Sequence, residues 1–205
     1  MTEPLARPKR KNPLRKTRAP LAPQGVRSRT AQGLTAAAAE GRFALQVCEE
    51  CGSVIYPPRD ACPACLSVRL PYRDVEPAGT LVAETTVRVS PDTYFRERVP
   101  WRLGTVKLDV GPLIVAHLHG DALEGARVRL SLQLDKSGAP VVFALPDPPT
   151  PNMQDDPQLR EMTCDPKFRR VLITDGRNAV GQAMAKAFAV AGASILFVGI
   201  ADPWK

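Results

Sequence analysis

Four of the five cysteines in this chain lie in one short segment, CEECGSVIYPPRDACPAC, which runs from Cys48 to Cys65. They form two Cys-x-x-Cys pairs, and each pair is typical of a knuckle, a tight turn that directs two thiolates toward one point. Two knuckles together supply the tetrahedral shell of four sulfur atoms that zinc prefers. The segment therefore predicts a structural zinc site with four ligands: Cys48, Cys51, Cys62 and Cys65.

The residues around the cysteines favour a metal site over a redox centre. Gly52 directly follows the second cysteine, where a positive φ costs glycine little, and Pro63 restricts the second turn. A redox dithiol generally needs one Cys-x-x-Cys at a helix N-terminus, whereas here a loop with two adjacent prolines links two pairs. Four protein ligands leave no open position for water, which favours a structural role. The fifth cysteine, Cys164, is expected to be a bystander.

Length and composition narrow the class of protein. The chain has 205 residues, 44% of them apolar, which is enough for one or two packed domains. It has no run of 18 apolar residues and no apolar stretch after its basic N-terminal residues. We therefore expect no membrane span, no secretory signal and a cytoplasmic location. In that reducing compartment four clustered cysteines are more often a metal site than two disulfides.

Residues 1–29 are predicted to be a basic disordered tail. They hold nine Lys or Arg residues, one acid and five prolines, without apolar periodicity. The tail has a net charge of +8 and the rest of the chain sums to −1, so the overall charge of +7 is a property of the tail. Such a tail suits RNA, anionic membranes or an acidic partner, and a solvated extension without a ligand is an equally open interpretation.

Residues 30–74 are predicted to form a helix followed by a zinc ribbon. The stretch TAQGLTAAAAEG predicts a short helix with Thr30 as N-cap and Gly41 as its stop, packed on the zinc module. RFALQVC predicts a strand that leads into the first knuckle. VIYPPRDAC predicts an extended loop between the knuckles.

Residues 75–147 contain five short runs that are typical of β-strands. The runs are GTLVAETTVRV, GTVKLDV, PLIVAHLH, ARVRLSLQLD and PVVFAL. In the fourth run apolar and polar residues alternate strictly, as a half-buried antiparallel strand requires. Five strands in a segment of this length suit a small closed barrel, and we predict an OB fold.

Residues 30–147 as a whole resemble a known family. FALQVCEECGSVIYPPRDACPACLSVRL, followed by an AGTLVAETTV strand, is similar to acyl-CoA-associated proteins that join a rubredoxin-like zinc ribbon to an OB fold. Its C-x-x-C-G, Y-P-P-R and C-P-x-C elements fall in the order expected of that family. The resemblance implies zinc binding by the four cysteines. It also implies a non-catalytic partner, in a hetero-oligomer, of a thiolase-like or aldolase-like enzyme or of a hydratase, with no catalytic residues to carry over.

A zinc ribbon with an OB barrel also suits nucleic-acid binding, which is the second hypothesis. That function needs a positive groove and aromatic side chains on which bases stack. The predicted barrel strands carry one aromatic residue, Phe143, and the region beyond the tail has no net positive charge. We therefore expect no specific nucleic-acid ligand. His117 and His119 share a face of one predicted strand, where ordinary packing is favoured over a metal site.

The loop SPDTYFRERVPW is the best local candidate for an anionic or planar ligand, including a CoA thioester. It combines aromatic with basic side chains, namely Tyr94, Phe95, Arg96, Arg98 and Trp101, and Arg102 follows directly. The alternative is that Phe95 and Trp101 plug the mouth of the barrel.

Residues 148–168 are predicted to be a linker, and residues 169–205 the start of another domain. RRVLITDGRNAVGQAMAKAFAVAGASILFVG reads as strand, tight turn, helix and strand, the unit that binds a dinucleotide pyrophosphate. It resembles the first segment of short-chain dehydrogenases, whose turn reads T-G-x-x-x-G-x-G. The resemblance implies an NAD(P) site at Thr174, Gly176 and Gly181.

This C-terminal segment departs from the dehydrogenase pattern. Asp175 replaces the first glycine of the motif, and Gly199 stands where an acid or a basic residue should contact the adenosine ribose. The chain stops before the Y-x-x-x-K pair that performs hydride transfer in that family, so we expect it to act as a dehydrogenase only within a longer protein.

The predicted fold is mainly β: a rubredoxin-like zinc ribbon and a five-stranded OB-fold barrel, followed by a partial Rossmann-type βαβ segment. Three hypotheses follow for its function. The first is an accessory module of acyl-CoA metabolism, the second a nucleic-acid-binding protein, and the third a part of an NAD(P)-dependent oxidoreductase.

Overall fold

The structure is a computed structural model of the chain. It describes residues 20–23, 25, 28–153, 156–163, 166, 170–193 and 195–199. Most of the predicted basic tail and Cys164 lie outside these residues. No helix in the described part of the chain is long and apolar enough to cross a membrane.

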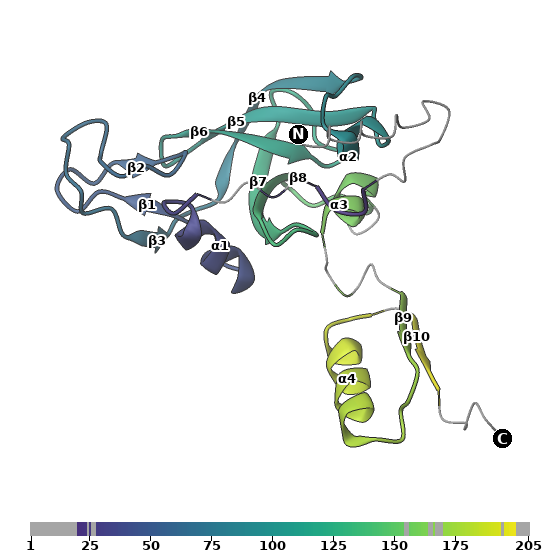
Figure 1. Ribbon diagram of the computed structural model, residues 1–205. Coiled ribbons are helices and arrows are strands. Elements are labelled where there is room, and N and C mark those ends of the chain that lie inside the picture. Colours follow the sequence, from purple (N-terminus) through teal and green to yellow (C-terminus); the bar gives the residue numbers. More distant parts are fainter. Residues whose placement is uncertain are drawn as a thin grey trace, which may run out of the picture.

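The N-terminal part of the fold is a helix followed by a small sheet (Figure 1). The elements are α1 (Gln32–Ala39), β1 (Ala44–Val47), β2 (Val54–Ile55) and β3 (Tyr72–Asp74), and the three strands form an antiparallel sheet in the order β2-β1-β3. Gly41 follows α1 with φ +69°, which confirms it as the stop. The predicted N-cap is wrong: Ala31 takes that position without a side-chain cap, and the Thr30 hydroxyl instead pairs with Ser28.

The second part is the predicted five-stranded barrel. Its strands are β4 (Ala78–Val87), β5 (Trp101–Leu108), β6 (Leu113–Leu118), β7 (Arg127–Leu134) and β8 (Pro140–Pro146), and they close in the order β4-β5-β6-β8-β7. All neighbouring pairs are antiparallel except β6 and β8, which run parallel where His117 lies opposite Phe143. At the β7–β8 turn the buried Asp135 carboxylate accepts hydrogen bonds from the backbone of Ser137 and Ala139.

Ribbon, helix and barrel share one hydrophobic core. Leu34, Ala37 and Ala38 of α1 and Ala44 and Leu45 of β1 belong to the same buried cluster as the inward-facing barrel residues. The prediction placed α1 on the zinc module. In the structure α1 contacts β7 and β8 as well as β1, because its small alanine side chains fit against the barrel.

A second, smaller cluster lies on the outside of the barrel wall. Trp101, Leu103 and Phe143 alternate along their strands with residues of the inner core and therefore face outward. Two short helices cover them: α2 (Thr93–Arg96) and α3 (Pro157–Met162). Part of the segment assigned to the linker is thus folded. Asp156 caps α3 and also accepts the Gly120 N–H at 2.7 Å, which ties this helix to the barrel.

The C-terminal unit has the predicted order of strand, helix and strand. The elements are β9 (Arg170–Ile173), α4 (Ala179–Val190) and β10 (Ile195–Val198), and the two strands pair in parallel. Asn178 caps α4 by accepting the Gly181 N–H at 2.6 Å. A single βαβ unit does not by itself establish a Rossmann-type domain, so that assignment stays a prediction.

Candidate metal centre

The structure brings the four predicted cysteine ligands together. Their sulfur atoms all lie within 4.8 Å of one another, with 3.5 Å between Cys48 and Cys65 and 3.6 Å between Cys51 and Cys62. Sulfur atoms that bind one zinc ion tetrahedrally at about 2.3 Å lie about 3.8 Å apart. The four thiols therefore fit a single zinc ion that is fully enclosed by protein ligands.

The two knuckles repeat the same backbone hydrogen bonds. In each, the first cysteine N–H donates to the residue five positions later, and its carbonyl accepts from the residue four positions later. The bonds are Cys48 N–H to Ser53 O at 2.9 Å, Cys62 N–H to Ser67 O at 2.8 Å, Gly52 N–H to Cys48 O at 2.9 Å and Leu66 N–H to Cys62 O at 2.9 Å. The site thus has local twofold similarity, and its two halves can be compared directly.

The environment of the thiols suits thiolate ligands. Cys48 and Cys62 are buried beside Ile55 and Leu70, whereas Cys51 and Cys65 face the surface. Hydrogen bonds with the side chain and backbone of Ser53 lower the pKa of the Cys51 thiol to about 6. The Cys65 thiol shifts the other way: its backbone hydrogen bond with Ser67 lowers its pKa, but the neighbouring thiols and burial raise it to about 12. Zinc binding requires all four thiols in the thiolate form.

Gln46 on β1 fixes the loop between the knuckles. Its side chain is 6% exposed, accepts the backbone N–H of Arg59 at 2.7 Å and donates to the carbonyl of the same residue at 3.0 Å. Sequence reasoning missed this role. The available signal was a lone amide side chain in the otherwise apolar strand ALQV.

The predicted ligand loop contributes its aromatic residues to the outer cluster. Tyr94 and Trp101 are 0% and 4% exposed, and the Phe95 ring stacks on His117. The Trp101 indole N–H donates to Nδ1 of His117 at 2.8 Å. Phe95 and Trp101 therefore do not plug the barrel mouth, because Trp101 lies on the outside of the wall and Phe95 belongs to α2, which covers it.

The arginines of this loop make contacts within the protein. Arg98 binds Glu161 at 2.7 Å and lies 3.9 Å above the centre of the Tyr94 ring. Arg96 donates to a nearby backbone carbonyl at 2.9 Å, and Arg102 donates to three carbonyls in the loop after β6. The Arg98 contact anchors α3 to this loop, and the Arg102 contacts hold the loop after β6. A CoA thioester bound at this loop stays a prediction.

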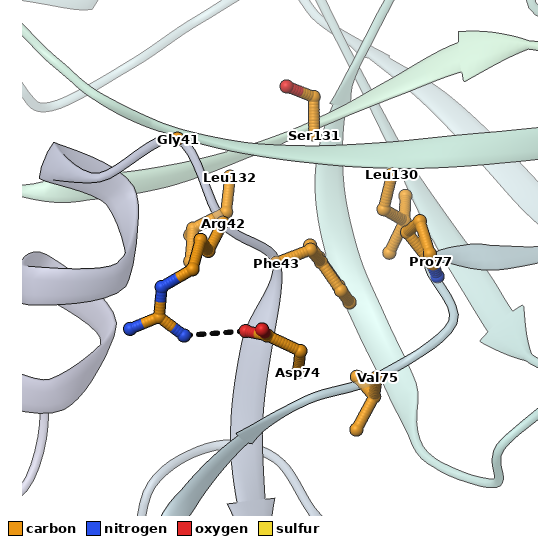
Figure 2. A pocket seen from close by; sticks show the side chains of 9 residues that line it. All are labelled: Gly41, Arg42, Phe43, Asp74, Val75, Pro77, Leu130, Ser131 and Leu132. Atoms are coloured by element: carbon orange, nitrogen blue, oxygen red, sulfur yellow. Dashed lines mark hydrogen bonds and ion pairs between the residues drawn. The ribbon is translucent and has the colours of Figure 1, made fainter.

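A cavity of about 390 Å³ lies where the ribbon meets the barrel (Figure 2). It is lined by Gly41, Arg42, Phe43, Asp74, Val75, Pro77, Leu130, Ser131 and Leu132. The Arg42 guanidinium binds the Asp74 carboxylate at 2.6 Å, so the charged groups of the lining neutralise one another. The remaining lining is mostly apolar and offers no group of nucleophile and base.

The predicted dinucleotide residues meet at the turn between β9 and α4. A Cβ on Gly181 would lie 2.0 Å from the carbonyl of Asp175, so this glycine permits the helix to approach the turn. Gly176 donates its N–H to Gly199 at 2.8 Å, and Thr174 is exposed. The Asp175 carboxylate accepts the Arg177 N–H, which lowers the pKa of Asp175. A negative charge therefore sits in the turn where a pyrophosphate would bind.

Comparison with known proteins matches the ribbon and the barrel. The family model of the ChsH2 rubredoxin-like zinc ribbon domain matches residues 35–69, and that of the ChsH2 C-terminal OB-fold domain matches residues 72–133. A solved structure described as an Ltp2-ChsH2(DUF35) aldolase aligns with a TM-score of 0.52 and 21% identity, over 60% of this chain and 98% of that chain.

A second solved structure, a DUF35-family protein of unknown function from Sulfolobus solfataricus, aligns with a TM-score of 0.42 and 13% identity, over 58% of this chain and 86% of that chain. No curated protein shows significant similarity to the chain. The matches confirm the predicted zinc ribbon and OB fold, and neither family model reaches the βαβ segment.

Proposed function

We propose that residues 30–147 form a non-catalytic accessory module that binds and supports a thiolase-like or aldolase-like enzyme of acyl-CoA metabolism. One observation carries the proposal: the ribbon that holds the four thiols shares a hydrophobic core with an OB barrel through β1, and both domains match ChsH2 in the same order. One solved ChsH2 structure is described together with Ltp2 as an aldolase.

The described residues support a role without chemistry of its own. Among them, the only group of His, Cys, Asp or Glu side chains that could hold a metal ion is the four-cysteine site. Its four ligands leave no position for a substrate or a water molecule. The reactive groups must therefore come from the partner enzyme.

Nucleic-acid binding is the weaker hypothesis. OB folds bind oligonucleotides on the face of their second and third strands, which here are β5 and β6. On that face Trp101, Leu103 and His117 lie under or beside α2 and α3. Trp101 packs edge-on against Phe95, and His117 stacks on the same Phe95 ring, so these two rings are not free to stack on bases.

Co-expression of the chain with a thiolase-like or aldolase-like acyl-CoA enzyme should give one complex in size-exclusion chromatography. The isolated chain should show no turnover. The physical reason is that the module lacks catalytic groups but offers a rigid, zinc-stabilised scaffold. The activity of the partner should be higher in the complex than alone. Two separate peaks together with unchanged thiolytic or aldolytic activity would contradict the proposal.

A second function is favoured by the parallel β9–α4–β10 unit and its Asn178-capped helix. We infer that this unit begins an NAD(P)-dependent dehydrogenase domain of a longer protein. Such a fusion would place the oxidation of a 3-hydroxyacyl thioester beside the enzyme that cleaves the 3-oxoacyl product. A short flexible linker raises the local concentration of the second site to about the millimolar range.

Removal of the Asp175 carboxylate tests this second function. If the turn accepts a pyrophosphate, Asp175→Gly should tighten NADH or NADPH binding by up to about fivefold, since a charge near a helix N-terminus is worth up to ~1 kcal/mol. Isothermal titration of the longer parent protein, in which the domain is complete, measures it, with Arg177→Gln as a control that is not expected to tighten binding. No detectable binding by either wild type or Asp175→Gly would contradict the assignment.

A further inference from the structure

The second zinc knuckle carries two exposed aliphatic side chains at its end. Leu66 and Val68 are each 77% exposed, and we refer to this pair as the knuckle tip. Figure 1 shows the loops of the ribbon at the end of the molecule that lies away from the barrel. The tip is therefore accessible in the isolated chain, although burial of such side chains is favourable.

Leu66 also has an unfavourable backbone conformation. Its φ is +63°, and it is the only residue other than glycine in the described part of the chain with a positive φ. The equivalent position of the first knuckle is Gly52, with φ +72° and the same hydrogen bond to the carbonyl of the first cysteine of its knuckle. The fold therefore accepts glycine at this position, and a leucine there is disfavoured by the local structure.

The charges around the knuckles are neutralised within the ribbon. Arg69 forms ion pairs with Glu49 and Glu50, and Arg73 binds Glu49 at 3.1 Å. These two basic and two acidic side chains of the ribbon thus pair with one another and carry no net charge. An anionic partner such as a nucleic acid or a lipid headgroup gains nothing from this arrangement. A protein pocket that is apolar at its centre and polar at its rim complements it.

We propose that the knuckle tip inserts into an apolar pocket of the partner enzyme and that Leu66 is the main anchor of that contact. The inference rests on the proposed accessory function and adds the part of the surface that does the binding. Burial of the Leu66 side chain in the complex would offset its unfavourable backbone conformation, since a well-packed aliphatic anchor can dominate an interface.

A second copy of this chain is the alternative occupant. Two tips of two side chains each would bury little area against each other across a twofold axis, whereas a tip that enters a different surface of the next copy makes a head-to-tail contact. Such head-to-tail contacts form open chains unless they close into a ring. Complex formation with a different protein avoids this outcome.

The test compares Leu66→Gly and Leu66→Asn with the wild-type full chain, using a purified thiolase-like or aldolase-like acyl-CoA enzyme from the same organism. Both replacements tolerate a positive φ, so the thermal midpoint should be unchanged or higher by up to about 4 °C. The dissociation constant should rise at least about 10-fold, the loss expected of an interface anchor. A merely structural role for Leu66 would not combine greater stability with weaker binding.

Leu123→Asn is the matched control, because Leu123 is 65% exposed on the barrel and lies outside the ribbon. It should change the dissociation constant by less than about twofold. Equal binding by Leu66→Asn and wild type would overturn the role of the tip and leave the accessory function intact. No complex with wild-type protein would overturn both. Self-association of wild type that Leu66→Asn abolishes would overturn the proposed partner in favour of a second copy.

Discussion

Replacing Cys62 by serine is expected to abolish zinc binding and to unfold the ribbon. Cys62 is 0% exposed, so a hydroxyl that binds zinc poorly would be left buried in its place. A structural zinc ion supplies on the order of 10 kcal/mol of apparent binding free energy, which is comparable to the whole stability of a domain. Metal analysis of the wild-type protein should give one zinc ion per chain.

Thermal unfolding followed by circular dichroism measures the consequence, with Cys164→Ser as the control. That replacement removes a thiol predicted to be a bystander and should leave both zinc content and melting unchanged. Because Ala44 and Leu45 of the ribbon share a core with the barrel, removal of zinc should also lower the melting temperature of the barrel. A wild-type protein without zinc, or unaltered melting after chelation, would contradict this expectation.

Acidification from pH 7 to pH 4 is expected to destabilise the fold by about 3 kcal/mol through His117, since each unit of pKa difference is worth ~1.4 kcal/mol. Burial lowers the pKa of His117 from its ordinary 6.5 to about 4, with Asp135 opposing the shift. The unfolded chain then takes up the proton first. The stability is therefore complete above about pH 6.5 and is lost as the pH falls toward 4.

The hydrogen bonding of His117 also predicts that protonation of its ring destabilises the fold. Its Nδ1 accepts the Trp101 indole N–H at 2.8 Å, so a proton added to Nδ1 would place two donors against each other. His117→Gln keeps an acceptor but does not titrate. Urea unfolding of this variant should show a smaller loss of stability than the wild type between pH 6.5 and 4.5, because protonation of the zinc ligands weakens both proteins alike.

The Glu161 carboxylate does not account for a loss of stability between pH 6.5 and 4.5. Burial raises the pKa of Glu161, but its ion pairs with Lys136 and Arg98 outweigh that effect and leave the pKa lowered. Such groups lose their stabilising effect only as the pH falls below their ordinary values, near 4. Equal slopes of wild type and His117→Gln above pH 4.5 would therefore contradict the role given to His117.

The elements that sequence reasoning found are those with strong local signals. The barrel strands alternate apolar and polar residues, as β7 shows in its burial pattern, and the zinc ligands follow from their spacing alone. Strands β2 and β3 have only two and three residues, which is too few for any periodicity. Helix α3 has six residues, and only the Asp156-Pro157 start marked it in the sequence.

The residues of the outer cluster could not be assigned because their partners are remote in sequence. Arg98 and Glu161 lie 63 residues apart, and Arg102 meets Gln158 across a similar separation. A basic and aromatic loop looks the same in the sequence whether it binds a ligand or its own chain. The side on which Trp101 lies also depends on how β5 pairs in the barrel, which composition does not reveal.

The position of α1 against the barrel also sets an order for folding during synthesis. The ribbon is local: its four cysteines and three strands lie within residues 44–74, so it can bind zinc soon after it leaves the ribosome. Leu34, Ala37 and Ala38 of α1 cannot be buried against β7 and β8 until residues 127–146 have been made. The earliest described helix thus completes its contacts among the last, which raises the contact order and slows folding.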